Sequence, residues 1–325
     1  MKPLLDVRNL SVTFKSRKGE LTVVEDVSFV VERGQILGIA GESGCGKSVT
    51  SLSILGLLSE NGYISNGQIL FEEKNLAEFS DLELSDVRGN DISMIFQDPL
   101  SSLNPTMSIG DQMIEPYLVH KNYSVKEAEK AALDMLLKVG IPSPEQRMNE
   151  YPHQLSGGMR QRVMIAMALS CEPKLLIADE PTTALDVSIQ AQILKLMQQL
   201  NDDTGASIML ITHDMGVIAE MSDKVMIMYA GKSVEYGPVD DIFFSPRHPY
   251  TQGLLASIPN LDKDVDQLST IEGNVPSPKD MPAGCRFSPR CPKRMDICTQ
   301  QVPAMRTAGN SQVACFLYEP DEGKA

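Results

Sequence analysis

The sequence contains no tryptophan, only 5% aromatic residues and no apolar run long enough to span a membrane. Its opening residues, from Met1 to Asp6, also lack the apolar core of a secretory signal. We therefore expect a chain that works on the cytoplasmic side, where it can still dock on a membrane protein. The 325 residues, 42% of them hydrophobic, suffice for a substantial core, so a fibrous or disordered protein is not expected.

Basic residues are also few in comparison with acidic residues. The chain has 29 lysine and arginine residues against 43 acidic residues, which gives a formal net charge of −14. Nonspecific nucleic-acid binding requires basic residues that displace the counterions of the phosphates, so we expect no nucleic-acid partner. Cysteine is scarce too, and four of the six cysteines lie between positions 285 and 315. In a reducing compartment this clustering favours a metal site over disulfide bonds.

What the sequence does contain is a glycine-rich loop at residues 41–48, which reads Gly-Glu-Ser-Gly-Cys-Gly-Lys-Ser. An apolar run at 36–40 precedes the loop, and the apolar spacing over 49–58 predicts a helix after it. Strand, glycine loop and helix form the context of a phosphate-binding loop, whose N–H groups and helix dipole face an anion. We expect Lys47 to reach the β- and γ-phosphates and Ser48 to offer its hydroxyl to Mg²⁺. The loop therefore predicts that the chain binds a nucleoside triphosphate.

The remaining pattern predicts an α/β fold. Residues 4–14 and 21–31 alternate apolar and polar positions, as half-buried antiparallel strands do. Later apolar runs alternate with helical stretches, which indicates a largely parallel sheet with helices on both faces. The expected strands are 67–71, 92–96, 174–181, 207–212 and 225–229, and the expected helices are 108–120, 124–139, 156–169 and 187–200. Residues from about 98 to 170 are expected to form a helical insertion.

Polar residues stand where several of these strands end. Asp179 and Glu180 close one strand, and since parallel strands present their carboxyl ends at the ligand-binding edge, Asp179 suits Mg²⁺ and Glu180 suits an attacking water. His213 follows another strand and is a candidate contact of the γ-phosphate, while Gln97 is a candidate ligand of Mg²⁺ or of the water. An acid pair can also cap the next helix, and a lone histidine is more often structural. The phosphate loop decides the interpretation in favour of a catalytic site.

A second candidate anion site begins at Ser156. Ser156, Gly157 and Gly158 open the helix expected over 156–169, so free N–H groups and the positive end of the helix dipole are available there. One chain would then contain two phosphate-binding ends.

These motifs, in this order, resemble those of ABC-type ATPases, the motor subunits of ABC transporters. The resemblance covers residues 1–238 and implies an ABC-type P-loop ATPase with a mostly parallel sheet core, an N-terminal antiparallel β subdomain and a helical subdomain. It makes 41–48 the Walker A motif, 175–179 Walker B, Glu180 the catalytic glutamate, Gln97 the Q-loop and His213 the switch histidine. In this family Walker A of one subunit and the signature of a second subunit enclose one ATP in a head-to-tail dimer.

The resemblance also implies a set of ligand contacts. Met159 departs from the usual signature, which more often has glutamine there. Phe14 is a candidate to stack on adenine, and a core or edge aromatic is nearly as plausible an interpretation. The residues expected at ATP are Phe14, Ser43, Gly44, Cys45, Gly46, Lys47, Ser48, Val49, Ser156, Gly157, Gly158, Met159 and Asp186. Those expected at Mg²⁺ are Ser48, Gln97 and Asp179.

Residues 239–325 form an extension with a resemblance of its own. Its segments at 247–255, 273–276 and 282–285 resemble the C-terminal region of oligopeptide and dipeptide transporter ATPases. This resemblance implies the D-type ATPase subunit of a peptide importer at the cytoplasmic face of the membrane. Its expected partners are a second, paralogous ATPase subunit, two permeases and an extracytoplasmic peptide-binding protein. Import of another small solute, such as nickel or glutathione, is the alternative, and a soluble ABC ATPase outside transport is a more remote one.

Four cysteines lie in this extension, at Cys285, Cys291, Cys298 and Cys315. Four soft thiolates suit a [4Fe–4S] cluster or Zn²⁺. Zinc ribbons usually contain Cys-x2-Cys pairs, which are absent here, and similar cysteines in dipeptide-transporter ATPases favour the iron–sulfur cluster. Unligated thiols are the remaining alternative. A structural or redox-sensing role is expected, because ATP hydrolysis requires no electron transfer.

Overall fold

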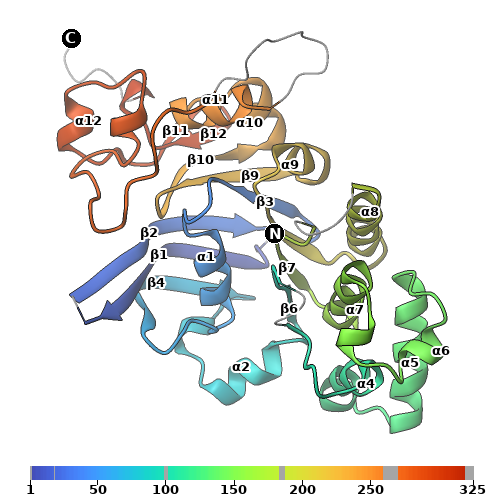
Figure 1. Cartoon of the computed structure of the whole chain (residues 1–325). Coiled ribbons are helices and arrows are strands. Elements are labelled where there is room, and N and C mark those ends of the chain that lie inside the picture. Colours follow the sequence, from blue (N-terminus) through green and yellow to red (C-terminus); the bar gives the residue numbers. More distant parts are fainter. Residues whose placement is uncertain (1, 18, 99–101, 183–186, 259–269, 319–325) are drawn as a thin grey trace. The chain divides into compact units, whose positions relative to one another are not determined.

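The computed structural model describes residues 2–17, 19–98, 102–182, 187–258 and 270–318 (Figure 1). Asp186 lies outside these residues. The chain divides into two units, and each is described by itself. Unit 1 comprises residues 1–4, 31–35 and 78–211, and unit 2 comprises residues 5–30, 36–77 and 212–325. Among the residues with described structure, no helix is long and apolar enough to cross a membrane.

Unit 2 contains an antiparallel sheet of strand order β2-β1-β4-β5. Its strands are β1 (Leu5–Ser16), β2 (Gly19–Val31), β4 (Gly62–Phe71) and β5 (Lys74–Asn75). β1 pairs with β4 from Leu5 opposite Phe71 to Phe14 opposite Gly62, and helix α1 (Lys47–Ile54) packs against both strands. The two predicted half-buried strands are therefore confirmed.

A second group of strands in unit 2 leads from the phosphate loop to the C-terminal extension. β3 (Ile36–Ala40) runs parallel to β9 (Lys224–Tyr229). β9 pairs antiparallel with β10 (Lys232–Pro238), followed in order by β12 (Ser311–Val313) and β11 (Arg306–Ala308). The extension thus adds two strands beside β10. The helices here are α9 (Met215–Met221), α10 (Val239–Phe244), α11 (Pro249–Ala256) and α12 (Ile297–Gln300).

Unit 1 is built on three parallel strands in the order β8-β7-β6. β7 (Leu175–Asp179) and β8 (Ser207–Ile211) are buried at every position, as expected for parallel strands covered on both faces, and β6 (Ile92–Ile95) is mostly buried. The helices are α2 (Asp81–Val87), α4 (Ile109–His120), α5 (Val125–Lys138), α6 (Pro144–Arg147), α7 (Gly157–Leu169) and α8 (Val187–Thr204).

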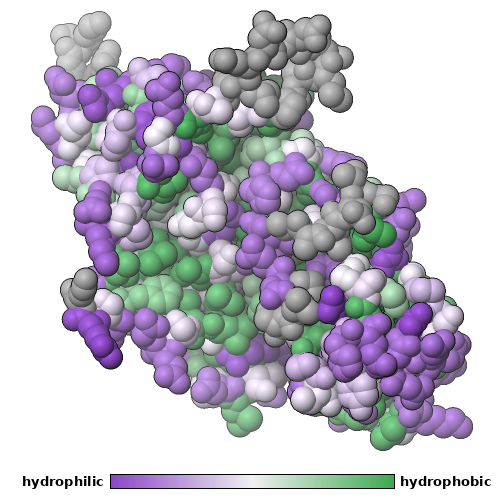
Figure 2. All heavy atoms as spheres, viewed as in Figure 1, coloured by the Kyte–Doolittle hydropathy of each residue, from purple (hydrophilic) through white to green (hydrophobic). Residues whose placement is uncertain are grey.

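The helices that follow β6 have clear sequence causes. Ser108 caps α4, and Ser124 caps α5 in a reciprocal capping box with Glu127. α5 packs beside α4, α6 and α7, and the visible face of this group is mostly hydrophilic (Figure 2). All regular elements described between residues 102 and 170 are helical, as predicted.

Two predicted boundaries are wrong: the strand predicted at 67–71 begins at Gly62, and the helix after the phosphate loop ends early. The helix after the phosphate loop was expected over 49–58, but α1 ends at Ile54. Gly56 adopts φ +62°, its N–H donates to Ser53 O, and Leu57 N–H donates to Leu52 O. These two bonds around a left-handed glycine form a Schellman motif, which ends the helix although the apolar residues continue.

Candidate functional site

The phosphate loop between β3 and α1 has the backbone that its glycines predict. Gly46 precedes α1 with φ +103° and no side-chain cap, so the first N–H groups of the helix stay open. Gly41 adopts φ +152°, and a Cβ there would lie 2.2 Å from the Met228 carbonyl oxygen. Both positions therefore require glycine. Ser43 and Gly44 are exposed at the loop tip, and Ser48 and Val49 are partly buried in the first turn of α1.

Lys47 lies folded into the loop. The side chain is 6% exposed, and its Nζ donates to Gly41 O at 2.7 Å and to Glu42 O at 3.2 Å. Cys45 is buried beside it, with its Sγ 3.8 Å from Lys47 Nζ. Burial raises the pKa of the Cys45 thiol despite the nearby ammonium group, so this cysteine stays protonated at neutral pH and packs as a small apolar residue. The cation is thus held where a triphosphate would meet it.

Phe14 is half-buried on β1 and covers its cross-strand partner Gly62. A Cβ at Gly62 would lie 2.7 Å from Phe14 Cε1, so the ring packs directly on the glycine backbone. This contact explains the position of the ring. Stacking of Phe14 on adenine stays a prediction.

In unit 1 the candidate Mg²⁺ ligand Asp179 and the candidate catalytic residue Glu180 follow each other at the end of β7. Asp179 is 4% exposed and is the last residue of the strand. Glu180 is partly exposed, adopts φ +48° and donates its N–H to Ile211 O of β8 at 2.8 Å. Gln97 Nε2 donates to Glu180 Oε2 at 3.1 Å. The structure therefore brings Gln97 and Glu180 together, and Glu180 is held in a backbone conformation that non-glycine residues rarely adopt.

The start of α7, also in unit 1, is exposed. Ser156 caps the helix, and its hydroxyl accepts the Met159 N–H at 3.3 Å. A Cβ at Gly157 would meet no atom within 4 Å, and the first turn contains no acidic residue. Gly158 and Met159 are partly buried. This end of the helix therefore presents its N–H groups and positive dipole to solvent.

His213 belongs to unit 2, where it is exposed just before α9. The following residue, Asp214, caps α9 and accepts N–H groups from Gly216 and Val217. The backbone around His213 is thus fixed by a neighbouring helix cap. Its role toward the γ-phosphate stays a prediction.

Comparison with known proteins decides the family. A family model described as "ABC transporter" matches residues 24–183, and one described as "Oligopeptide/dipeptide transporter, C-terminal region" matches residues 234–298. The chain is 52% identical to the oligopeptide transport ATP-binding protein AppD of Bacillus subtilis, over 99% of this chain and 98% of the relative. It is 51% identical to the dipeptide transport ATP-binding protein DppD of the same species, over 98% and 96%. The chain belongs to the oligopeptide/dipeptide family of ABC transporter ATP-binding proteins.

Solved structures agree with this membership. A dimeric, post-hydrolysis structure of the ATP-binding cassette MJ0796, bound to ADP and Pi, aligns with a TM-score of 0.66 and 26% identity. The alignment covers 72% of this chain and 98% of that cassette. The predicted ABC-type fold is confirmed, and the chain is an ABC-type ATPase that binds ATP.

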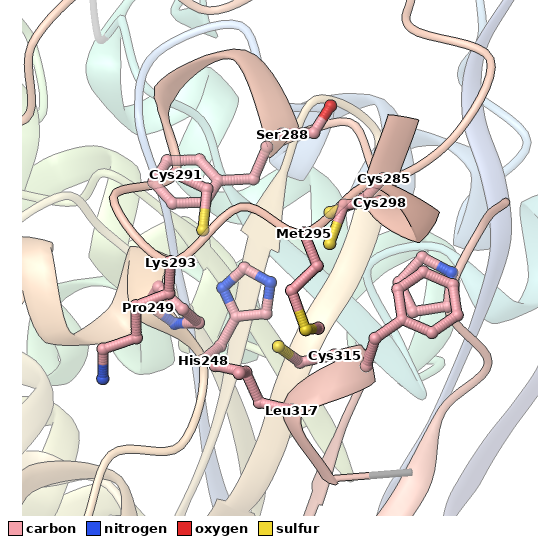
Figure 3. A pocket seen from close by; sticks show the side chains of 13 residues that line it. His248, Pro249, Cys285, Ser288, Cys291, Lys293, Met295, Cys298, Cys315 and Leu317 are labelled. Atoms are coloured by element: carbon pink, nitrogen blue, oxygen red, sulfur yellow. The ribbon is translucent and has the colours of Figure 1, made fainter. Parts of the chain in front are cut away.

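The four cysteines of the extension of this ABC ATPase line a single pocket, together with His248 (Figure 3). All four are free thiols. Burial, and to a smaller extent the proximity of the other three sulfurs, raises the pKa of Cys285 to about 11. Burial also raises the pKa of Cys291 and of Cys315. Burial thus favours the neutral thiol at these three cysteines, and a bound metal would have to displace their protons.

The expected metal site is only partly matched by this arrangement. Among the residues that the structure describes, no three His, Cys, Asp or Glu side chains are grouped closely enough to hold a metal ion. The structure brings the four cysteines to one pocket, and a [4Fe–4S] cluster or zinc ion held by them stays a prediction.

Two residues of the C-terminal extension contact the phosphate loop, and the sequence does not identify them. Arg290 and Tyr250 both contact Glu42, the second residue of the loop. Tyr250 lies 208 residues after Glu42, and Arg290 lies 248 residues after it. No periodicity or spacing in the sequence predicts contacts over such separations.

Proposed function

We propose that this chain binds and hydrolyses ATP to power the import of dipeptides or oligopeptides by an ABC transporter. The observation that supports it best is the full-length match to oligopeptide and dipeptide transport ATP-binding proteins, which includes the extension. A general ABC motor would match over the first 240 residues or so and differ afterwards. Import of nickel or glutathione is the alternative substrate class.

We assign the chemical roles as follows. Lys47 and the loop N–H groups hold the β- and γ-phosphates, and Ser48, Gln97 and Asp179 coordinate Mg²⁺. Glu180 orients the attacking water and accepts its proton, and the hydrogen bond from Gln97 supports this role by fixing the carboxylate. His213 contacts the γ-phosphate. Asp186, Phe14 and the residues from Ser156 to Met159 complete the site, the last group toward the ATP of a second subunit.

The assembly is part of the proposal. Two ATPase subunits, this chain and a paralogue, form a head-to-tail dimer on the cytoplasmic face of two permeases, which receive peptide from an extracytoplasmic binding protein. Residues 1–238 form the ATPase domain and 239–325 the extension. The helical insertion at about 98–170 receives the permease helices beside Gln97.

Reconstitution tests this function. The chain is co-purified with its permeases and second ATPase, placed in proteoliposomes and supplied with its binding protein. Di- or oligopeptide should stimulate ATP hydrolysis and enter the vesicles, and the ligand on the purified binding protein should be a peptide. Stimulation by nickel or glutathione alone would replace the peptide assignment and leave the ATPase assignment intact.

The cysteine pocket is proposed to hold a [4Fe–4S] cluster, with Zn²⁺ as the second candidate. Four cysteines that converge on one pocket supply the soft ligands that either group requires. Protein purified without oxygen should contain about four irons per chain, and Cys298→Ser should remove them. Colourless protein with one zinc per chain would exclude the cluster.

A further inference from the structure

Every polar group of Glu42 is engaged within unit 2. Its N–H donates to the Tyr250 hydroxyl at 2.9 Å, and its two carboxylate oxygens lie 3.0 and 3.1 Å from Arg290 Nη1. Its carbonyl accepts from Lys47 Nζ and from the Cys45 N–H, both at 3.2 Å. The second residue of the phosphate loop therefore connects Lys47 on one side with the extension on the other.

Arg290 is itself fixed in place. Its side chain is 6% exposed, its Nε donates to Glu272 O at 3.0 Å and its Nη2 donates to Ile271 O at 3.1 Å. The guanidinium also lies over the Tyr229 ring, 5.8 Å from the centroid. A guanidinium can make all of these contacts at once because its five donors are held in one plane, whereas a lysine cannot. Arg290 is thus a rigid partner for Glu42.

Tyr250 is fixed by aromatic packing. It is fully buried, and its ring lies 4.6 Å from that of Tyr229 and 5.4 Å from that of Phe287. Both contacts are edge-on or tilted, the geometry that aromatic pairs prefer. Phe287 lines the cysteine pocket on one side and contacts Tyr250 on the other. The hydroxyl that accepts the Glu42 N–H therefore has no freedom to follow the loop if the loop moves.

The pairing also has an electrostatic consequence. A triphosphate bound to this loop brings several negative charges toward the Glu42 carboxylate, and like charges at short range repel. Arg290 neutralises that carboxylate. We infer that Arg290 and Tyr250 are positioning residues for ATP binding: through Glu42 they hold the phosphate loop in its binding shape and cancel its one unfavourable charge. The inference rests on the proposed binding of ATP by this loop.

Equilibrium binding of Mg–ATP to the purified full chain tests it. Arg290→Met should weaken binding about tenfold, because the Glu42 carboxylate is then left uncompensated. Adding Glu42→Gln to this variant should restore most of the affinity, since a neutral side chain neither needs the arginine nor repels phosphate. Arg294→Met removes an exposed arginine of the same segment and should leave the affinity unchanged.

Two results would overturn the inference. One is a folded Arg290→Met variant that binds Mg–ATP like the parent. The other is a double variant as weak as Arg290→Met alone, because general loosening of the extension would then be the cause. If Arg290→Met does not fold, Tyr250→Phe provides the test, since it keeps the ring and removes only the acceptor of the Glu42 N–H. It should weaken binding about threefold, and unchanged affinity would count against the role.

Failure of this inference can be distinguished from failure of the proposed function. A parent chain that fails to bind Mg–ATP would remove the proposed function itself. A parent chain that binds ATP but whose variants show none of these changes would remove only the positioning role.

Discussion

The chain contains two helix starts suited to phosphate, at α1 and at α7, and they are built in different ways. α1 begins after a left-handed glycine, and the lysine in its first turn is almost fully buried and already hydrogen-bonded within the loop. α7 begins after an exposed serine whose hydroxyl caps the helix itself, with open space around Gly157 and no buried cation. The start of α1 is thus a closed loop with its own positive charge, and the start of α7 is an open helix end.

This difference indicates that the two helix starts have different roles in binding ATP. A cradle with a buried cation and open N–H groups can hold a triphosphate by itself. A single exposed helix end offers less than a full charge and is screened by water, so it needs a ligand that something else already holds. This is the arrangement expected if the α7 start closes on the ATP of a second subunit. Substitutions at each helix start can separate the two roles.

Glu180→Gln should reduce ATP turnover about 10²- to 10⁴-fold, because the glutamine cannot accept a proton from water. Since both helix starts would remain on unhydrolysed ATP, an ATP-dependent dimer should accumulate. Phosphate release and light scattering measure the two effects. Glu172→Gln, at an exposed acid before the same strand, is the matched control. Turnover at the parent rate would remove Glu180 from its role.

Lys47→Ala should weaken ATP binding by the single chain about 100-fold, the loss expected for about 3 kcal/mol of charge-assisted hydrogen bonding. Calorimetric titration measures the affinity. Lys195→Ala, in α8, is the comparison variant and should bind ATP normally. If Lys47→Ala bound ATP normally, the cradle would not depend on its buried cation, and the contrast with α7 would disappear.

Ser156→Ala should leave ATP binding by the single chain unchanged and weaken ATP-driven dimerisation about tenfold, because it removes a cap and a hydroxyl from the open helix end only. Ser124→Ala removes a serine cap of the same kind from α5 and serves as the control, with no effect on dimerisation. Weaker binding by the Ser156→Ala monomer would show that α7 acts within its own chain.

The smallest effects concern stability. Gly46→Ala should destabilise the chain by about 1 to 2 kcal/mol, since its φ of +103° disfavours a side chain. Gly157→Ala should be neutral or stabilise by about 0.5 kcal/mol, since its Cβ would meet nothing within the chain. Thermal unfolding measures both. If Gly157→Ala folds well and still loses ATP-driven dimerisation, the second subunit or its ATP must occupy the space beside Gly157 in the dimer. Retained dimerisation would contradict that conclusion.

Much of the fold could be predicted because local signals agreed with it. The expected helices at 108–120 and 124–139 appear as α4 and α5, where serine caps mark the first turn. The buried strands that end near Asp179 and Thr212 follow from short apolar runs. The capping box of α2, formed by Ser80 and Glu83, is a local sequence signal for a helix that the apolar pattern alone does not predict.

The parts that were not predicted have one local cause and several distant ones. The end of α1 is set by Gly56, which interrupts an apolar series that by itself indicates a longer helix. The pocket formed by the four cysteines follows from their spacing only in outline, since spacing does not give the distances between sulfurs. The Gln97–Glu180 hydrogen bond joins two residues whose roles were expected but whose contact was not. Motifs therefore identify the residues of the site, and only the fold gives their partners.

The contacts of Glu42 also have a consequence during synthesis. The chain leaves the ribosome from its N-terminus, and domains generally fold as they emerge. The glycine loop is made early, but Tyr250 and Arg290 follow 208 and 248 residues later. A nascent chain therefore lacks the contacts that hold its nucleotide loop until nearly all of it has been translated. Incomplete chains would then compete poorly for cellular ATP.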